Sequence, residues 1–151
     1  MHKVSTKRSE TSQIAKKFLH KITTGGQDKD GARVVGLSGE LGAGKTAFVQ
    51  EIAKHLAIKS KIASPTFVIM KKYSIKKLND YKFLFHLDAY RLKSEKELLG
   101  LGWQEIIGNK EHLVFIEWPE NVAKIMPSHT KFVYVSHAEG KKGNKKRNFK
   151  L

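Results

Sequence analysis

The chain has 151 residues, a length that suits one domain with a buried core, so we expect a single domain over residues 1–151. Its 29 basic and 14 acidic residues give a net charge of +15, which fits either attraction to RNA, DNA or acidic protein surfaces or a Lys-rich solubilising surface. The absence of cysteine excludes disulfide and thiolate chemistry, and the absence of a membrane-length apolar run or a signal-like start predicts a soluble, cytoplasmic protein.

The first half of the chain alternates between helical and strand patterns. Apolar residues recur at helical spacing over residues 10–22, and Ser9 is a candidate cap for that helix. The apolar run at residues 32–37 predicts a short buried strand, and residues 45–57 again have helical spacing. The Gly-rich string GELGAGKT lies between this strand and this second helix, which gives the order strand, loop, helix.

The second half of the chain is dominated by strand patterns. Two of them flank an Asn-Asp turn and predict an antiparallel hairpin, at residues 66–75 and 81–87. A near-continuous apolar run at residues 112–116 predicts a central buried strand. Residues 131–135 and 147–151 predict two more strands, joined by a basic turn that we interpret first as a solvated hairpin tip.

One further helix is predicted between the hairpin and the central strand. Ser94 and Glu97 form a capping-box pattern, and the apolar side of this helix continues beyond Gly102 to Trp103 and Ile106. Together the elements predict an α/β domain with a mixed sheet. Parallel core strands are expected around the Gly-rich loop, with antiparallel hairpins flanking them and helices on both faces.

The Gly-rich string matches the phosphate-binding pattern G-x-x-x-x-G-K-[ST] in full. Its glycines let backbone N–H groups close around phosphates, and the following helix N-terminus adds a favourable dipole. Lys45 is placed to reach the β- and γ-phosphates, and the Thr46 hydroxyl is placed to ligate Mg²⁺. The sequence therefore predicts a P-loop NTPase-like domain that binds a purine nucleoside triphosphate with Mg²⁺ through Gly39, Glu40, Leu41, Gly42, Ala43, Gly44, Lys45 and Thr46.

Two carboxylates stand at the ends of apolar strands, where a triphosphatase needs a group that holds Mg²⁺ or orients water. Asp88 follows the run LFHL, and Glu117 follows the run LVFI. The second run is more completely apolar and thus more central, which makes Glu117 the first choice for the Mg²⁺ site. An ion pair or a helix cap at a strand end is the alternative for either residue.

Three other side chains near these motifs are candidates of lower specificity. Thr66 follows a proline in a segment that can lie over the phosphates, where a hydroxyl can sense the γ-phosphate. His86 alternates with Asp88 on a predicted strand, and a packed or hydrogen-bonded histidine is the favoured interpretation. Trp118 stands beside Glu117, so it either lines the site or a partner surface, or packs in the core.

Four motifs in this order, LSGELGAGKT, SPTF, HLDAYRL and IEWPE, resemble those of the TsaE family of small bacterial P-loop ATPases. The resemblance runs from the first helix to the C-terminal hairpin. It implies a role in making threonylcarbamoyladenosine in tRNA, with ATP hydrolysis resetting a complex of a TsaD-type transferase and a TsaB-type partner. With this resemblance, the second interpretation of the basic C-terminal turn is a tRNA or partner contact. Direct contact with tRNA is left open, and no membrane partner is implied.

The resemblance also implies roles for individual residues. Lys45 and the loop amides hold the phosphates of ATP or ADP, and Thr46 and Glu117 resemble the Mg²⁺ ligands. Asp88 supports the site or polarises water. Further matches are a switch threonine, a site-proximal tryptophan and a first-helix residue near the nucleotide, at Thr66, Trp118 and Thr11.

Two other functions fit the same loop. One is a small P-loop kinase for a metabolite, although the chain has few arginines for a lid: Arg8, Arg33, Arg91 and Arg147. The other is a nucleotide-gated binding module with negligible turnover, because slow ATPases and pure switches share this loop.

Overall fold

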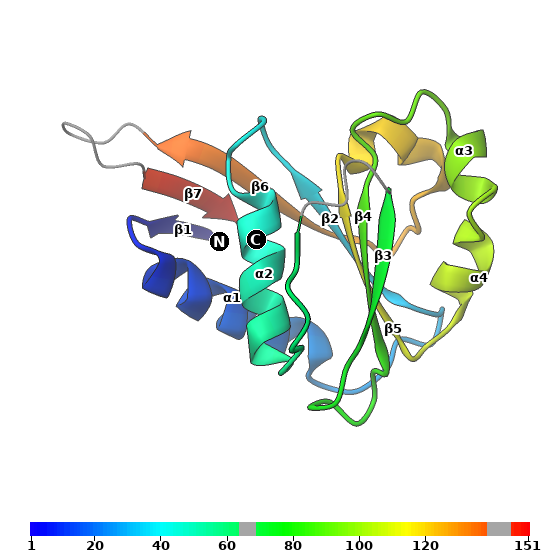
Figure 1. The fold of residues 1–151 in the computed structure, drawn as a ribbon, viewed down its shortest axis with the longest axis horizontal. Helices are drawn as coiled ribbons and strands as arrows, with labels where there is room; N and C mark the ends of the chain where they lie inside the picture. Colours follow the sequence, from blue (N-terminus) through cyan, green and yellow to red (C-terminus); the bar gives the residue numbers. More distant parts are fainter. Residues whose placement is uncertain (64–68, 139–145) are drawn as a thin grey trace.

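A seven-stranded mixed sheet forms the centre of the computed structural model, which describes residues 1–63, 69–138 and 146–151 (Figure 1). The strands are β1 His2–Ser5, β2 Arg33–Ser38, β3 Met70–Ser74, β4 Phe83–Asp88, β5 His112–Glu117, β6 Lys131–Ala138 and β7 Lys146–Lys150. Their order across the sheet is β1-β7-β6-β2-β5-β4-β3.

The inner strands of the sheet are parallel and the outer ones are antiparallel. Strand β2 pairs in parallel with β5 and β6, and β5 pairs in parallel with β4. The pairs β3–β4, β6–β7 and β1–β7 are antiparallel. All six residues of β5 are buried, as expected for a parallel strand covered on both faces. The predicted α/β class, with a parallel core and antiparallel flanks, is therefore confirmed.

Helices cover both faces of the sheet, as predicted. The first face carries α1 (Arg8–Thr23) and α2 (Lys45–His55). The second face carries α3 (Glu95–Leu99), α4 (Trp103–Gly108) and the 3-10 helix η1 (Pro119–Ile125). Across the described residues, no helix combines the length and the apolar character needed to cross a bilayer.

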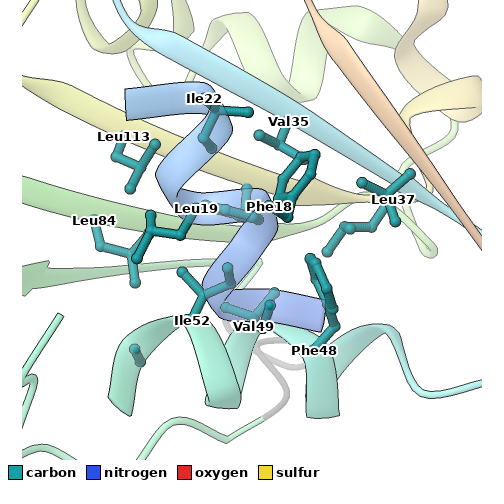
Figure 2. Packing of buried hydrophobic residues seen from close by; sticks show 14 of the residues in the cluster. Phe18, Leu19, Ile22, Val35, Leu37, Phe48, Val49, Ile52, Leu84 and Leu113 are labelled. Carbon is teal, nitrogen blue, oxygen red and sulfur yellow. The ribbon is translucent and has the colours of Figure 1, made fainter. Parts of the chain in front are cut away.

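The larger of two hydrophobic clusters lies between the sheet and the pair α1 and α2. Figure 2 shows apolar side chains of these helices directed toward one another and toward the sheet: Phe18, Leu19 and Ile22 of α1, Phe48, Val49 and Ile52 of α2, and Val35, Leu37, Leu84 and Leu113 of the strands. The Phe48 ring also packs against Phe149 of β7, with 5.5 Å between centroids. This packing fixes the N-terminal end of α2, and with it the loop that precedes the helix, against the sheet.

The helix α1 begins earlier than the Ser9 cap predicts. Its N-cap is Lys7, and the side chain of Glu10 reaches back to accept hydrogen bonds from the backbone N–H groups of Thr6 (2.5 Å) and Lys7 (3.2 Å). The carboxylate thus satisfies amides that a helix start leaves without partners. Ser9 lies inside the first turn, so its prediction as the cap was wrong.

The single helix predicted after Ser94 is two helices, α3 and α4. Gly102 adopts a left-handed conformation (φ +84°) that an α-helix cannot contain, and it separates the two segments. The Ser94 side chain makes no capping hydrogen bond, so the predicted capping box is not formed. The apolar side was nevertheless identified correctly, because Leu98, Trp103 and Ile106 are buried together in the second cluster.

Two elements were not predicted from the sequence, and one prediction lies partly outside the described residues. Strand β1 is only four residues long and has β7 as its one neighbour among the described strands, and η1 follows closely on β5. The strand predicted at residues 66–75 is β3 over Met70–Ser74, and residues 64–68 are outside the described part of the chain.

A buried carboxylate joins α1 to α2. The Oε1 atom of Glu51 lies 2.5 Å from Nε of Arg8 and 3.1 Å from Nζ of Lys54. Burial pushes the pKa of Glu51 upward, but the hydrogen bonds from Arg8 and Lys54 outweigh it and hold that pKa below its ordinary value. Glu51 therefore stabilises the fold above the pKa it has in the unfolded chain, and this stabilisation is lost as the pH falls through its lowered folded-state pKa.

Replacing Glu51 with Gln is accordingly expected to lower the free energy of unfolding by roughly 1 kcal/mol at pH 7 and by progressively less in acid. Urea titrations of both proteins between pH 7 and pH 3 measure the difference. If the difference in the free energy of unfolding between the two proteins stayed constant across that pH range, the Glu51 charge would not contribute to stability.

Candidate functional site

The Gly-rich loop runs from the end of β2 to the start of α2, the arrangement that phosphate-binding loops require. Gly39 has φ +147°, and a Cβ atom at this position would lie 2.0 Å from the backbone oxygen of Val135. Only glycine fits so close to strand β6. Within the loop, the Ala43 N–H donates to the Glu40 oxygen at 3.1 Å, and Gly44 takes a left-handed conformation at the N-cap of α2.

The side chain of Lys45 curls back over the loop. Its ammonium donates hydrogen bonds to the backbone oxygens of Gly39 and Glu40, the latter at 2.9 Å, and the residue is 5% exposed. Burial lowers the pKa of Lys45, and the nearby carboxylates of Glu117, Glu120 and Asp88 only partly oppose that effect. The loop therefore holds a partly desolvated cation, which favours the binding of an anion beside it.

Thr46, the next residue, lies against the carboxylate of Glu117. Its hydroxyl oxygen is 3.0 Å from Oε2 and 3.1 Å from Oε1. Glu117 ends strand β5, and only 4% of it is exposed. The two residues are far apart in the sequence, which by itself does not predict their contact. The contact forms because β5 is the parallel neighbour of β2, so both strands end at the same edge of the sheet.

Asp88 stands beside Glu117 at this edge. The two residues are register partners at the ends of β4 and β5, and Asp88 is 6% exposed. One Asp88 oxygen accepts a hydrogen bond of 2.9 Å from the Tyr90 N–H, which fixes the turn after β4. Both candidate carboxylates therefore lie at strand ends beside the loop, and Glu117 is the one that contacts Thr46.

Trp118 forms a wall of the site and also packs on the second cluster, so both interpretations of this residue describe its position. Its backbone is left-handed (φ +59°), a conformation that costs a non-glycine residue roughly 1–3 kcal/mol, and its N–H donates to the Leu37 oxygen at 3.0 Å. The centre of the indole ring lies 4.3 Å from the Lys45 ammonium nitrogen and 4.9 Å from the centre of the Tyr90 ring.

These residues surround a cleft of about 220 Å³, lined by Leu41, Gly42, Gly44, Lys45, Thr46, Ala47, Asp88, Glu117 and Trp118. The cleft is smaller than the roughly 300–1,000 Å³ of sites that enclose a whole drug-sized ligand. Its size suits the phosphate end of a nucleotide, with the sugar and base extending outside.

The donor atoms in the cleft suit Mg²⁺. Thr46 and Glu117 supply hard oxygen ligands, and Mg²⁺ is typically held by one or two protein oxygens together with phosphates and waters. Among the described residues, no group of three or more His, Asp or Glu side chains forms a complete metal cage. The oxygens of Thr46 and Glu117 fit a metal that arrives with a nucleotide.

Arg147, the first residue of the strand predicted at residues 147–151, lies against the Gly-rich loop, a contact that the sequence did not predict. A Cβ atom on Gly44 would lie 2.9 Å from its Nε and 3.2 Å from its Cζ, so the guanidinium packs directly on the loop. Strand alternation explains this position, because Arg147 shares a face of β7 with Phe149, which packs against α2. The predicted basic turn covers residues 139–146; of these, 139–145 are outside the described part of the chain, and Lys146 begins β7.

Thr11, a predicted site residue of the first helix, does not line the cleft. Thr11 is 1% exposed, and its hydroxyl lies 2.7 Å from the Ser5 hydroxyl. Ser5 pairs with Arg147 across β1 and β7, so Thr11 is linked through Ser5 to the strand that carries Arg147. Thr66 lies outside the described residues.

Comparison with known proteins identifies relatives of this chain. The family model for threonylcarbamoyl adenosine biosynthesis protein TsaE matches residues 5–149. The tRNA threonylcarbamoyladenosine biosynthesis protein TsaE of Rickettsia prowazekii is 37% identical over 127 residues, which span 83% of this chain and 78% of that protein. The protein of the same name from Treponema pallidum is 40% identical over 97 residues, which span 64% of this chain and 67% of that protein.

A solved structure shows the same fold. The crystal structure of Bacillus subtilis YdiB superposes with a TM-score of 0.70 at 24% sequence identity, covering 99% of this chain and 83% of that one. The predicted resemblance is confirmed by the match over nearly the whole sequence. The chain belongs to the TsaE family of threonylcarbamoyl adenosine biosynthesis proteins.

Proposed function

We propose that this protein is a magnesium-dependent ATPase that serves the tRNA threonylcarbamoyladenosine modification machinery in the cytoplasm. The observation that carries the proposal is the contact between the Thr46 hydroxyl and the Glu117 carboxylate at the N-terminus of α2. A hydroxyl and a carboxylate at this point of a P-loop are the protein oxygens that hold Mg²⁺ on a nucleoside triphosphate. Family membership supports ATP as the nucleotide.

Each side chain has a proposed part in the reaction. Lys45 and the amides of residues 39–46 hold the phosphates and offset charge as the γ-phosphate leaves, while Thr46 and Glu117 hold the metal. Asp88 supports this arrangement or polarises the attacking water. Trp118 excludes water from one side of the cleft, and Mg²⁺ when bound neutralises charge on the phosphate oxygens.

We further propose that the partners are a TsaD-type transferase and a TsaB-type protein, with tRNA engaged through them. Family membership in the biosynthetic pathway supports this assignment. The net charge of +15 is compatible with an acidic protein surface or with RNA. A switch residue at Thr66 stays a prediction.

Measuring phosphate release tests the proposal against a metabolite kinase and against a binding module without turnover. The protein is incubated with ATP and Mg²⁺, alone, with the two partner proteins, and with a panel of small phosphate acceptors. Hydrolysis that rises with the partners supports the proposal. Transfer to a small acceptor would establish a kinase, and tight binding with no turnover under any condition would establish a binding module.

Replacing Arg147 with Ala is expected to weaken ATP binding about 10-fold, because one charge-assisted hydrogen-bond donor beside the phosphates is lost. The matched control is Lys150→Ala on the same strand, which removes an equal charge from an exposed position. Calorimetry at fixed ionic strength separates the two variants. Equal affinities for both would mean that Arg147 acts only through the net charge of the protein.

A further inference from the structure

His86 is a fully buried polar side chain that the proposed roles do not use. It is 0% exposed and lies on β4 between Leu84 and Asp88, on the face that carries α1 and α2. Its Nε2 atom is 2.7 Å from Oε2 of Glu117. His86 thus contacts the same carboxylate as Thr46, but from the interior of the protein.

The chemistry of the pair fixes the direction of this hydrogen bond. An ionised carboxylate only accepts, so Nε2 of His86 carries the proton and donates it to Oε2 of Glu117. Glu117 is 4% exposed and cannot rely on bulk water to solvate its charge. The described donors to its two oxygens are Thr46 at the loop and His86 behind it.

Packing alone does not account for a histidine at this position. The other ring nitrogen, Nδ1, is buried with no hydrogen-bond partner from the described residues. A buried polar atom left in this state costs about 1–3 kcal/mol, a penalty that an apolar side chain of similar size would avoid. The contact with Glu117 therefore offers a reason for histidine that core packing does not.

We propose that His86 is a positioning residue for the metal site. By holding Oε2 from behind, it fixes the plane of the Glu117 carboxylate, so that Oε1 and the Thr46 hydroxyl stay directed toward the metal that accompanies the nucleotide. Hydrogen bonds of this kind to metal-ligating carboxylates orient the ligand before the metal arrives. The inference rests on the proposed role of Glu117 in binding Mg²⁺.

The test uses Mn²⁺ as a paramagnetic substitute for Mg²⁺, and electron paramagnetic resonance measures its affinity in the presence of a non-hydrolysable ATP analogue. His86→Leu is expected to weaken Mn²⁺ binding about 10- to 100-fold. His86→Gln, whose amide nitrogen reaches the position of Nε2, is expected to recover most of this loss. In EDTA, both variants should bind the analogue as tightly as the unchanged protein does, because Lys45 and the loop amides remain in place.

Two further variants keep the test decisive. His112→Leu is the matched control, because His112 is a buried histidine of the neighbouring strand whose Nδ1 is 2.8 Å from the Ile106 oxygen, away from the loop. It should alter melting temperature but not Mn²⁺ affinity. If His86→Leu does not fold, His86→Asn replaces it, since the shorter amide is polar but does not reach Glu117.

The outcomes separate this inference from the function on which it rests. Unchanged Mn²⁺ affinity in His86→Leu or His86→Asn, or a His86→Gln variant as weak as the others, would overturn the positioning role alone. An unchanged protein that binds the analogue equally well with and without Mn²⁺ would overturn the proposed metal site, and the inference with it.

Discussion

Replacing Lys45 with Met is expected to reduce ATP affinity by at least about 100-fold, the largest effect of any single substitution in the loop. Lys45 is 5% exposed, and burial lowers the pKa of its ammonium, so this group meets a phosphate in surroundings where water screens the attraction poorly. Methionine keeps the length of the side chain beside Trp118 and removes only the charge and its hydrogen bonds. Calorimetric titration with ATP and with ADP measures the loss.

The stability of the Lys45→Met protein distinguishes lost binding from lost folding. Removing a partly desolvated charge offsets the loss of the hydrogen bonds to Gly39 and Glu40, so the melting temperature without nucleotide should change little. Lys54→Met on the same helix is the control, because Lys54 is 64% exposed and pairs with Glu51 away from the loop. Retained ATP affinity in Lys45→Met would refute the phosphate-binding role of the loop.

Replacing Glu117 with Gln is expected to lower Mg²⁺-dependent ATP hydrolysis by about 10²- to 10³-fold while ATP still binds. Glutamine retains the shape of the side chain but carries no charge to hold the metal. Because Lys45 and the loop amides are untouched, ATP affinity measured in EDTA should stay close to that of the unchanged protein. Phosphate release and calorimetry on the same preparation give both quantities.

Glu111→Gln is the matched control for this prediction. Glu111 directly precedes β5, at the opposite end of that strand from Glu117, and its carboxylate pairs with the Lys82 ammonium at 3.1 Å. Its loss should leave hydrolysis nearly unchanged. Normal turnover in Glu117→Gln would move the metal-binding role to Asp88, the register partner of Glu117.

The parts of the site that could be predicted are those in which local sequence fixes the chemistry. The loop pattern identified Lys45 and Thr46, and the apolar runs before Asp88 and Glu117 placed both residues at strand ends. Parallel strands leave a sheet at a common edge, so these strand ends could be expected near the loop. The hydrogen bond between Glu117 and Thr46 needed the further fact that β2 and β5 are neighbours.

Arg147 and the break at Gly102 show what sequence could not supply. Alternation indicates that Arg147 shares a face with Phe149, but only the order of the strands places that face against the start of α2. At Gly102 the helical apolar spacing continues on both sides, and the left-handed backbone that interrupts it leaves no trace in the apolar pattern. Strand β1 could not be predicted for a similar reason: its four residues form a strand because β7 lies beside them in the fold.

The position of Trp118 gives this protein an optical probe of its own site. The chain has two tryptophans, and the other, Trp103, is fully buried in the second cluster with its indole N–H bonded to the Ile125 oxygen at 3.0 Å. The Trp118 ring is 4.3 Å from the Lys45 ammonium, so a phosphate that draws this cation away alters the field on the indole. Emission from a Trp103→Phe protein therefore follows nucleotide arrival without any attached label.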